Sequence, residues 1–141
     1  MTKEVTIKIK GKQHYPEGEN LETVTESIGE YYLRNDSHYV MYEEKEAGFT
    51  ESSKCMLKIR NNTVELTKKG LIQSRMVFEE GRLHMTEYRT PFGMVMLGVQ
   101  TKHVRVLEEE NALAVQIEYG LEADEAHMAD CNIQISIRSK V

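Results

Sequence analysis

Residues 55–67 read CMLKIRNNTVELT, and this stretch decides the fold class. Cys55, Leu57 and Ile59 recur at every second position, which is the period of a strand with one buried face. Asn61-Asn62 then supplies a turn signal, and residues 63–67 again have the composition of a short strand. The stretch therefore predicts a β-hairpin.

The same two-residue period recurs along the rest of the chain. Glu80-Gly81 predicts a turn, so residues 71–90 are expected to form a second hairpin. Gly98 predicts a bend inside the longest expected strand, because a glycine within a strand often marks a bulge. The longest polar loops are expected at 12–20 and 122–130. The other expected strands cover residues 5–9, 38–46, 71–79, 82–90, 94–107, 112–121 and 131–137.

One segment, residues 22–33, fits two patterns. Its apolar residues have helical spacing, and Thr23 with Glu26 would form a capping box at a helix start. However, Val24, Ile28 and Tyr32 also share one face of a strand, and the segment is rich in Thr, Val, Ile and Tyr. We favour the strand.

Nine or ten strands joined by tight turns predict an antiparallel sheet. A sheet of this size has to manage its edges by curling, splitting or closing. The simplest solution is a single all-β, up-and-down barrel of about 8–10 strands that includes residues 1–141. A two-sheet sandwich is the alternative.

Composition excludes several functional classes. The chain has 141 residues, which is the size of one domain, and its net charge is −5. An acidic balance argues against nucleic acid as a partner, because phosphate binding needs a basic face. No apolar stretch has the length of a signal peptide or a membrane span, so we expect a cytoplasmic protein without a membrane partner. A monomer or a homodimer is compatible with this composition.

No cofactor or metal site is predicted. Cys55 and Cys131 form no Cys-x-x-Cys pair, and phosphate-loop and dinucleotide-binding signatures are absent. The densest group of ligand-type residues matches no known metal spacing and is interpreted as a polar loop. That group consists of Asp124, Glu125, His127, Asp130 and Cys131.

Several stretches together resemble a known family. They are residues 70–81 (GLIQSRMVFEEG), residues 88–93 (YRTPFG) with Met96 and Thr101 after them, and Tyr42-Glu43-Glu44 upstream. They are similar to the YwiB-like family, small bacterial proteins with a lipocalin-like, calycin-type antiparallel barrel and no assigned function. The resemblance spans nearly the whole chain. It implies the barrel and a strand at 22–33, and it implies no reaction.

Arg75 and Tyr88 are the first candidates for a ligand site. Arg75 lies among apolar residues, where a charge is costly unless it is paired. If its guanidinium points into the barrel, it could bind a carboxylate or phosphate, with Tyr88 as a second donor from the opposite strand. The alternative is a structural pair between Arg75 and an internal acid, Glu44 or Glu26.

The remaining candidates lie on the same or neighbouring strand faces. Glu44 could pair with Arg75, or act as a base if burial raises its pKa, or simply be a solvated acid. No catalytic residue is assigned, because no nucleophile motif occurs. The other candidate ligand-binding residues are Tyr42, His84, Thr90, Thr101 and Tyr119.

Three functional hypotheses follow from these residues. The first is a barrel that binds a small amphiphilic or anionic ligand in its interior. The second is an enzyme with an acid–base pair, such as Glu44 with His84 or Tyr88. The third is a structural or interaction protein with a filled core. We favour ligand binding over the filled core, and an enzyme is the least favoured.

Overall fold

The computed structural model describes residues 1–45, 48–124 and 126–140, and it confirms an all-β barrel. Among these residues there is no helix, and so none that could cross a membrane. The ten strands are β1 (Glu4–His14), β2 (Asn20–Arg34), β3 (Ser37–Lys45), β4 (Ser52–Arg60), β5 (Thr63–Gly70), β6 (Ser74–Glu79), β7 (Leu83–Thr90), β8 (Gly93–Glu109), β9 (Ala112–Ala123) and β10 (Ala126–Ser139).

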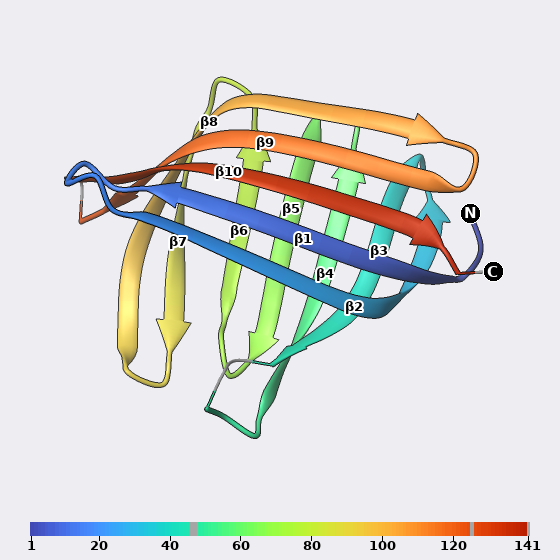
Figure 1. Cartoon of the computed structure of the whole chain (residues 1–141), viewed down its shortest axis with the longest axis horizontal. Coiled ribbons are helices and arrows are strands. Elements are labelled where there is room, and N and C mark those ends of the chain that lie inside the picture. The colour runs from blue at the N-terminus through green and yellow to red at the C-terminus, as the bar shows by residue number, and fades with distance from the viewer. Residues whose placement is uncertain (46–47, 125, 141) are drawn as a thin grey trace.

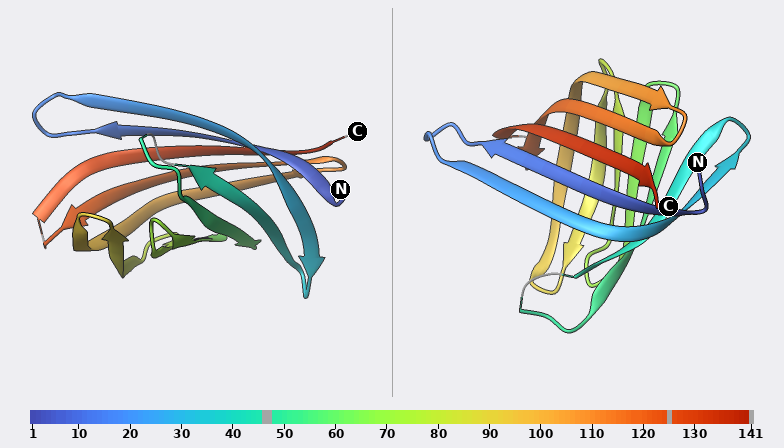
Figure 2. Two further views of the ribbon diagram at one scale, coloured as in Figure 1. Left: turned by 90° about the horizontal axis from the view of Figure 1, so that it is seen from below. Right: turned by 45° about the vertical axis from the view of Figure 1, so that its right-hand side comes forward.

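The strands form one antiparallel sheet in the order β6-β5-β4-β3-β2-β1-β10-β9-β8-β7. Apart from the β1–β10 pair, neighbours in the sheet are also consecutive in the chain, so the chain winds up and down. Figure 1 shows β1, β2, β9 and β10 crossing in front of β3 to β7. The long strands β2 and β8 bend from one layer into the other, as both views of Figure 2 confirm.

The barrel is nearly closed between β6 and β7. One isolated bridge spans this seam, in which the backbones of Gln73, just before β6, and Arg89 of β7 exchange hydrogen bonds of 3.0 and 2.9 Å. No ladder joins the rest of β6 to β7 within the described residues. The predicted hairpin at 71–90 therefore has its two strands and its turn, but its strands do not pair along their length.

Short turns fix the register of the hairpins. Asn35 and Asp36 both adopt positive φ, of 51° and 62°, and join β2 to β3. Two consecutive residues with positive φ are typical of the tight turns that match the twist of antiparallel strands. Gly70 ends β5 at φ 139°, and a Cβ there would lie 2.5 Å from the Ser52 carbonyl oxygen. Only glycine fits this close approach.

The hydrophobic core fills one end of the barrel. Along β1, Val5 and Ile7 are fully buried, whereas Ile9 and Gly11 are only partly buried. The same change occurs on β5, where Val64 is buried and Leu66 is half-buried. Side chains of alternating residues thus meet in a packed layer near the N-terminal half of β1, and this layer thins out toward its C-terminal half.

A chain of hydrogen bonds links β2 and β3 to β8 across the packed end of the barrel. The Tyr31 hydroxyl lies 2.6 Å from His38 Nδ1, and His38 Nε2 lies 2.5 Å from Glu108 Oε1. Tyr31 and His38 are on neighbouring strands, but Glu108 is on β8, which is not adjacent to them in the sheet. Both contacts are satisfied when the Tyr31 hydroxyl donates a hydrogen bond to Nδ1 and Nε2–H donates one to the Glu108 carboxylate.

Several details differ from the sequence-based expectations. Residues 22–33 form part of strand β2, as favoured. The expected loop at 12–20 is confirmed only for residues 15–19, because β1 extends to His14 and β2 begins at Asn20. The expected loop at 122–130 is mostly strand among its described residues, because β9 and β10 extend into it. The irregularity in β8 lies between Thr101 and His103 and not at Gly98. Gly98 stays in the ladder, and side-chain atoms of Met85, Leu83 and Glu122 would lie 3.1–3.3 Å from a Cβ there, which favours glycine at this position.

Candidate functional site

An interior cavity of about 630 Å³ occupies the barrel beyond the packed core. Alternating residues of β1, β2, β3 and β5 to β10 line it, because each strand points every second side chain inward. Its floor is formed in part by Phe78 and Tyr119, whose rings meet edge to face at 5.0 Å. Much of the wall is apolar, including Leu66, Met76, Phe78, Leu97, Leu121 and Ile133.

An ion pair lies in the cavity wall. Lys68 Nζ on β5 is 2.8 Å from Glu44 Oε1 on β3, and the two side chains are 15% and 16% exposed. The two strands flank β4, whose Cys55 faces Tyr42 on one side and Lys68 on the other. The period of two places Val64, Leu66 and Lys68 on one face of β5, so the lysine continues the row that points inward.

The pKa of Lys68 is raised. Burial alone would lower it, because a low dielectric disfavours the ammonium form. The Glu44 carboxylate and its hydrogen bond act in the opposite direction and outweigh burial, with smaller contributions from Tyr88 and Cys55. The lysine is therefore a fixed positive charge and a hydrogen-bond donor at neutral pH.

Two tyrosines of the cavity wall each lie beside a cysteine. Tyr42 is opposite Cys55 in the β3–β4 ladder, and Tyr119 is opposite Cys131 in the β9–β10 ladder. Burial raises the pKa of both phenols, and the neighbouring thiols raise it further. The Tyr42 hydroxyl is buried and meets no strong hydrogen-bond partner within the described part of the chain, since the adjacent thiol is a weak one.

Five of the eight candidate ligand-binding residues line this cavity. They are Tyr42, Glu44, Tyr88, Thr90 and Tyr119. They come from strands far apart in the sequence, and the closed sheet brings them together. The other three candidates lie elsewhere.

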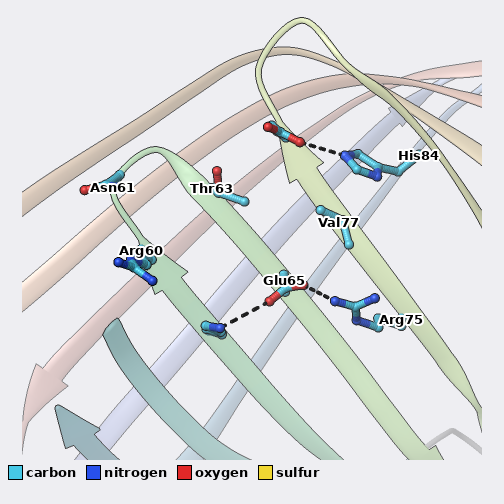
Figure 3. Close-up of a pocket in the computed structure, with 9 residues that line it drawn as sticks. Arg60, Asn61, Thr63, Glu65, Arg75, Val77 and His84 are labelled. Atoms are coloured by element: carbon cyan, nitrogen blue, oxygen red, sulfur yellow. Dashed lines mark hydrogen bonds and ion pairs between the residues drawn. The ribbon is translucent and has the colours of Figure 1, made fainter. Parts of the chain in front are cut away.

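Arg75 is on the outer face of the barrel. Its side chain is 67% exposed and its guanidinium pairs with Glu65 of the adjacent strand. Figure 3 shows Arg75 beside Glu65, with Val77 farther along the same strand. Arg75 therefore does not point inward next to Tyr88. It forms an ion pair, as the alternative expected, but its partner is Glu65 on the outer face and not Glu44 or Glu26.

His84 and Thr101 also lie outside the cavity wall. His84 Nε2 is 2.9 Å from Glu79 Oε1, in the outer depression beside the β6–β7 seam (Figure 3). Thr101 is fully buried on β8 opposite Tyr119, and its hydroxyl has no hydrogen-bond partner among the residues described. Thr101 lies beside Tyr119 on the same face of the sheet and does not line the cavity.

The outer depression is a weaker candidate than the interior. It measures about 410 Å³ and is lined by Lys58, Arg60, Glu65, Arg75, Glu79 and His84, among others. Its carboxylates are already paired: Glu65 with Arg75 and Lys58, and Glu79 with His84. Apart from Val77, its lining is polar or charged, whereas small-molecule sites are mostly apolar. We therefore place the candidate site in the interior.

Lys68 is the main residue that sequence reasoning missed. The alternation in residues 63–68 contains the signal, since Val64 and Leu66 fix which face is buried. Because a lysine near a strand end is usually solvated, the pattern alone does not single out Lys68. For metals, the described residues hold no group of three or more His, Cys, Asp or Glu that could bind an ion. One member of the group noted above, Glu125, lies outside the described residues.

Comparisons with known proteins agree with the fold. A comparison with curated proteins found no match. The crystal structure of the ywiB protein from Bacillus subtilis is similar with a TM-score of 0.82, at 19% identity over 99% of this chain and 93% of that chain. At this identity the likeness shows the fold, and it agrees with the resemblance of the sequence to the YwiB-like family. The model of the family described as a domain of unknown function (DUF1934) matches residues 7–135. This chain therefore belongs to the DUF1934 family.

Proposed function

We propose that the barrel binds a small amphiphilic molecule in its interior cavity. The observation that carries this proposal is the cavity of about 630 Å³ with a mostly buried ion pair, Glu44–Lys68, in a largely apolar wall. Pockets of roughly 300–1,000 Å³ with an apolar lining and few polar groups are typical of small-molecule sites. The apolar part of the ligand would contact Phe78 and Leu121, and its polar group would meet Glu44 and Lys68.

The ion pair is hard to explain as a device for stability. A buried salt bridge often contributes no more than well-packed apolar residues of the same volume, because desolvation offsets the Coulomb attraction. Lysine and glutamate are also rarely buried. Their position at the cavity surface is explained if they interact with a polar group of a ligand.

The raised pKa of Lys68 argues for binding rather than covalent chemistry. A lysine that forms a Schiff base needs a neutral amine, and enzymes obtain it by lowering the pKa. Glu44 has the opposite effect on Lys68. Lys68 therefore acts as a charged donor to a bound molecule.

Native mass spectrometry of gently purified protein tests the proposal. We expect an additional mass that leaves on denaturation. Ala123→Trp should abolish this mass, because Ala123 lines the cavity and an indole would fill it. Ala114→Trp is the matched control, since Ala114 is exposed on the same strand. A bare mass for the wild type in repeated preparations, with no binding of added amphiphiles, would favour the filled-core interaction protein.

A further inference from the structure

We propose that this cavity selects a ligand whose head group is neutral overall and both donates and accepts hydrogen bonds, such as a primary carboxamide. The inference rests on the proposed function and names the ligand class for the same site. It departs from the anionic ligand that Arg75 suggested, because Arg75 is not in the cavity.

The charge balance of the cavity carries the argument. Three charged residues line it: Lys12, Glu44 and Lys68. Lys12 is exposed, so water screens its charge. Glu44 and Lys68 are in direct contact and cancel each other at short range. The interior therefore offers no net charge to a head group.

A charged head group would gain little at this pair. A carboxylate that approaches Lys68 also approaches the Glu44 carboxylate, so attraction and repulsion largely offset each other. An ammonium that approaches Glu44 meets Lys68 in the same way. Either ion would still lose its hydration in a largely apolar cavity, and that cost remains uncompensated.

A carboxamide matches the hydrogen-bonding groups that the pair leaves available. Lys68 has three N–H donors and Glu44 has two carboxylate oxygens, and their mutual contact uses one of each. Neither residue has another ion-pair partner among the described residues. A carbonyl oxygen can accept from Lys68 while an amide N–H donates to the free oxygen of Glu44. Hydrogen bonds to charged groups of this kind are stronger than neutral ones.

Three probes with the same chain length test the selection: decanamide, decanoate and decylamine. Calorimetric titration of the wild type at neutral pH should give the tightest binding for decanamide. We expect each charged probe to bind about tenfold or more weakly, a difference of one unit in log Kd. The apolar tail is the same in all three, so the comparison isolates the head group.

Two single variants should change the order of affinities in opposite directions. Glu44→Gln leaves Lys68 uncompensated, so decanoate should become the tightest probe. Lys68→Met leaves the Glu44 carboxylate unpaired, so decylamine should become the tightest. The exchanged pair, E44K with K68E, keeps the cavity neutral and should retain the preference for decanamide. Circular dichroism identifies any variant that fails to fold.

The outcomes separate this inference from the proposed function. If the wild type binds decanoate or decylamine as tightly as decanamide, the inference is wrong and the cavity still binds amphiphiles. If no probe binds wild type and native protein carries no ligand, the proposed function fails. If both single variants fold and keep the wild-type order, the ion pair does not select the head group.

Discussion

Arg75 and Lys68 show what a strand pattern can and cannot decide about a single residue. Both are basic residues on the adjacent strands β5 and β6, and each has at least one apolar residue within two positions in the chain. On β5 the two faces differ, so the inward position of Lys68 could be read from Val64 and Leu66. On β6 both faces carry apolar residues, Met76 inward and Val77 outward, so a shift of one residue leaves the pattern unchanged. The sequence could not assign Arg75 to either face.

The buried phenols predict how stability depends on alkaline pH. Burial raises the pKa of Tyr42 and Tyr119 above the ordinary value of 10.0, and the pKa of Lys68 is raised above 10.5. A group with a raised pKa in the folded state contributes stability that is present below its unfolded pKa and is lost as pH rises. The free energy of unfolding should therefore fall above about pH 10.

Spectrophotometric titration of phenolate checks this expectation. Two of the seven tyrosines should ionise only together with the loss of the β-sheet signal in circular dichroism. The double variant Tyr42→Phe with Tyr119→Phe should lose that late step and keep the earlier ones. Complete ionisation of all tyrosines in protein that is still folded would contradict the assigned burial.

At the scale of elements, most strands could be predicted but the closure of the barrel could not. Alternation and turn residues predicted the hairpin at 55–67 and the strands at 82–90 and 94–107, but they paired 82–90 with 71–79 and not with 94–107. The seam between β6 and β7 depends on how the twist of ten strands accumulates around the barrel. No local pattern shows that residues 74–79 and 83–88 drift apart after a regular turn.

The β7–β8 hairpin is expected to open more readily than the rest of the sheet. Among the described residues, 93–95 of β8 pair only with β7, since Asp124 N–H donates to the Met96 carbonyl and β9 joins β8 from Leu97 onward. On its other side the hairpin is tied to the barrel by the Gln73–Arg89 bridge. Because few hydrogen bonds join the β7–β8 hairpin to the rest of the sheet, the free energy needed to open it locally is low. Because Tyr88 and Val95 belong to the cavity wall, this motion would give a ligand access.

Hydrogen exchange measures this motion without any ligand. Amides of residues 85–96 should exchange faster than those of β9 and β10. A disulfide between Gln73→Cys and Arg89→Cys should slow exchange in the hairpin, because residues paired across antiparallel strands lie within disulfide range. Reduction should restore fast exchange. The single variant Arg89→Cys is the control, and equal protection across β7 to β10 in the wild type would contradict a mobile hairpin.

At the scale of the whole molecule, the barrel combines a packed end with a hollow end. The up-and-down barrel follows from strand count and short turns, and these could be read from the sequence. The cavity could not, because the β1–β10 pair joins residues that are most of the chain apart, and the interior volume depends on that closure. A strand pattern says which side chains point inward and leaves open how much of the interior they fill.

The two ends should respond differently to the same substitution. Leu57 and Leu66 are direct partners in the β4–β5 ladder, yet Leu57 is fully buried and Leu66 lines the cavity. Leu57→Ala creates a new void in close packing and should cost about 2–5 kcal/mol of unfolding free energy. Leu66→Ala only enlarges an existing cavity, so its loss should be nearer to about 1 kcal/mol.

Urea denaturation of the two variants measures the two losses of unfolding free energy. Both variants replace leucine with alanine, so only the position differs. Calorimetric titration with decanamide should show the opposite ranking, since Leu66→Ala removes contacts to the ligand and Leu57→Ala does not. Equal destabilisation by both substitutions would mean that side chains from opposite strands close over Leu66. The hollow end would then be filled in solution, and the cavity would have no volume for a ligand.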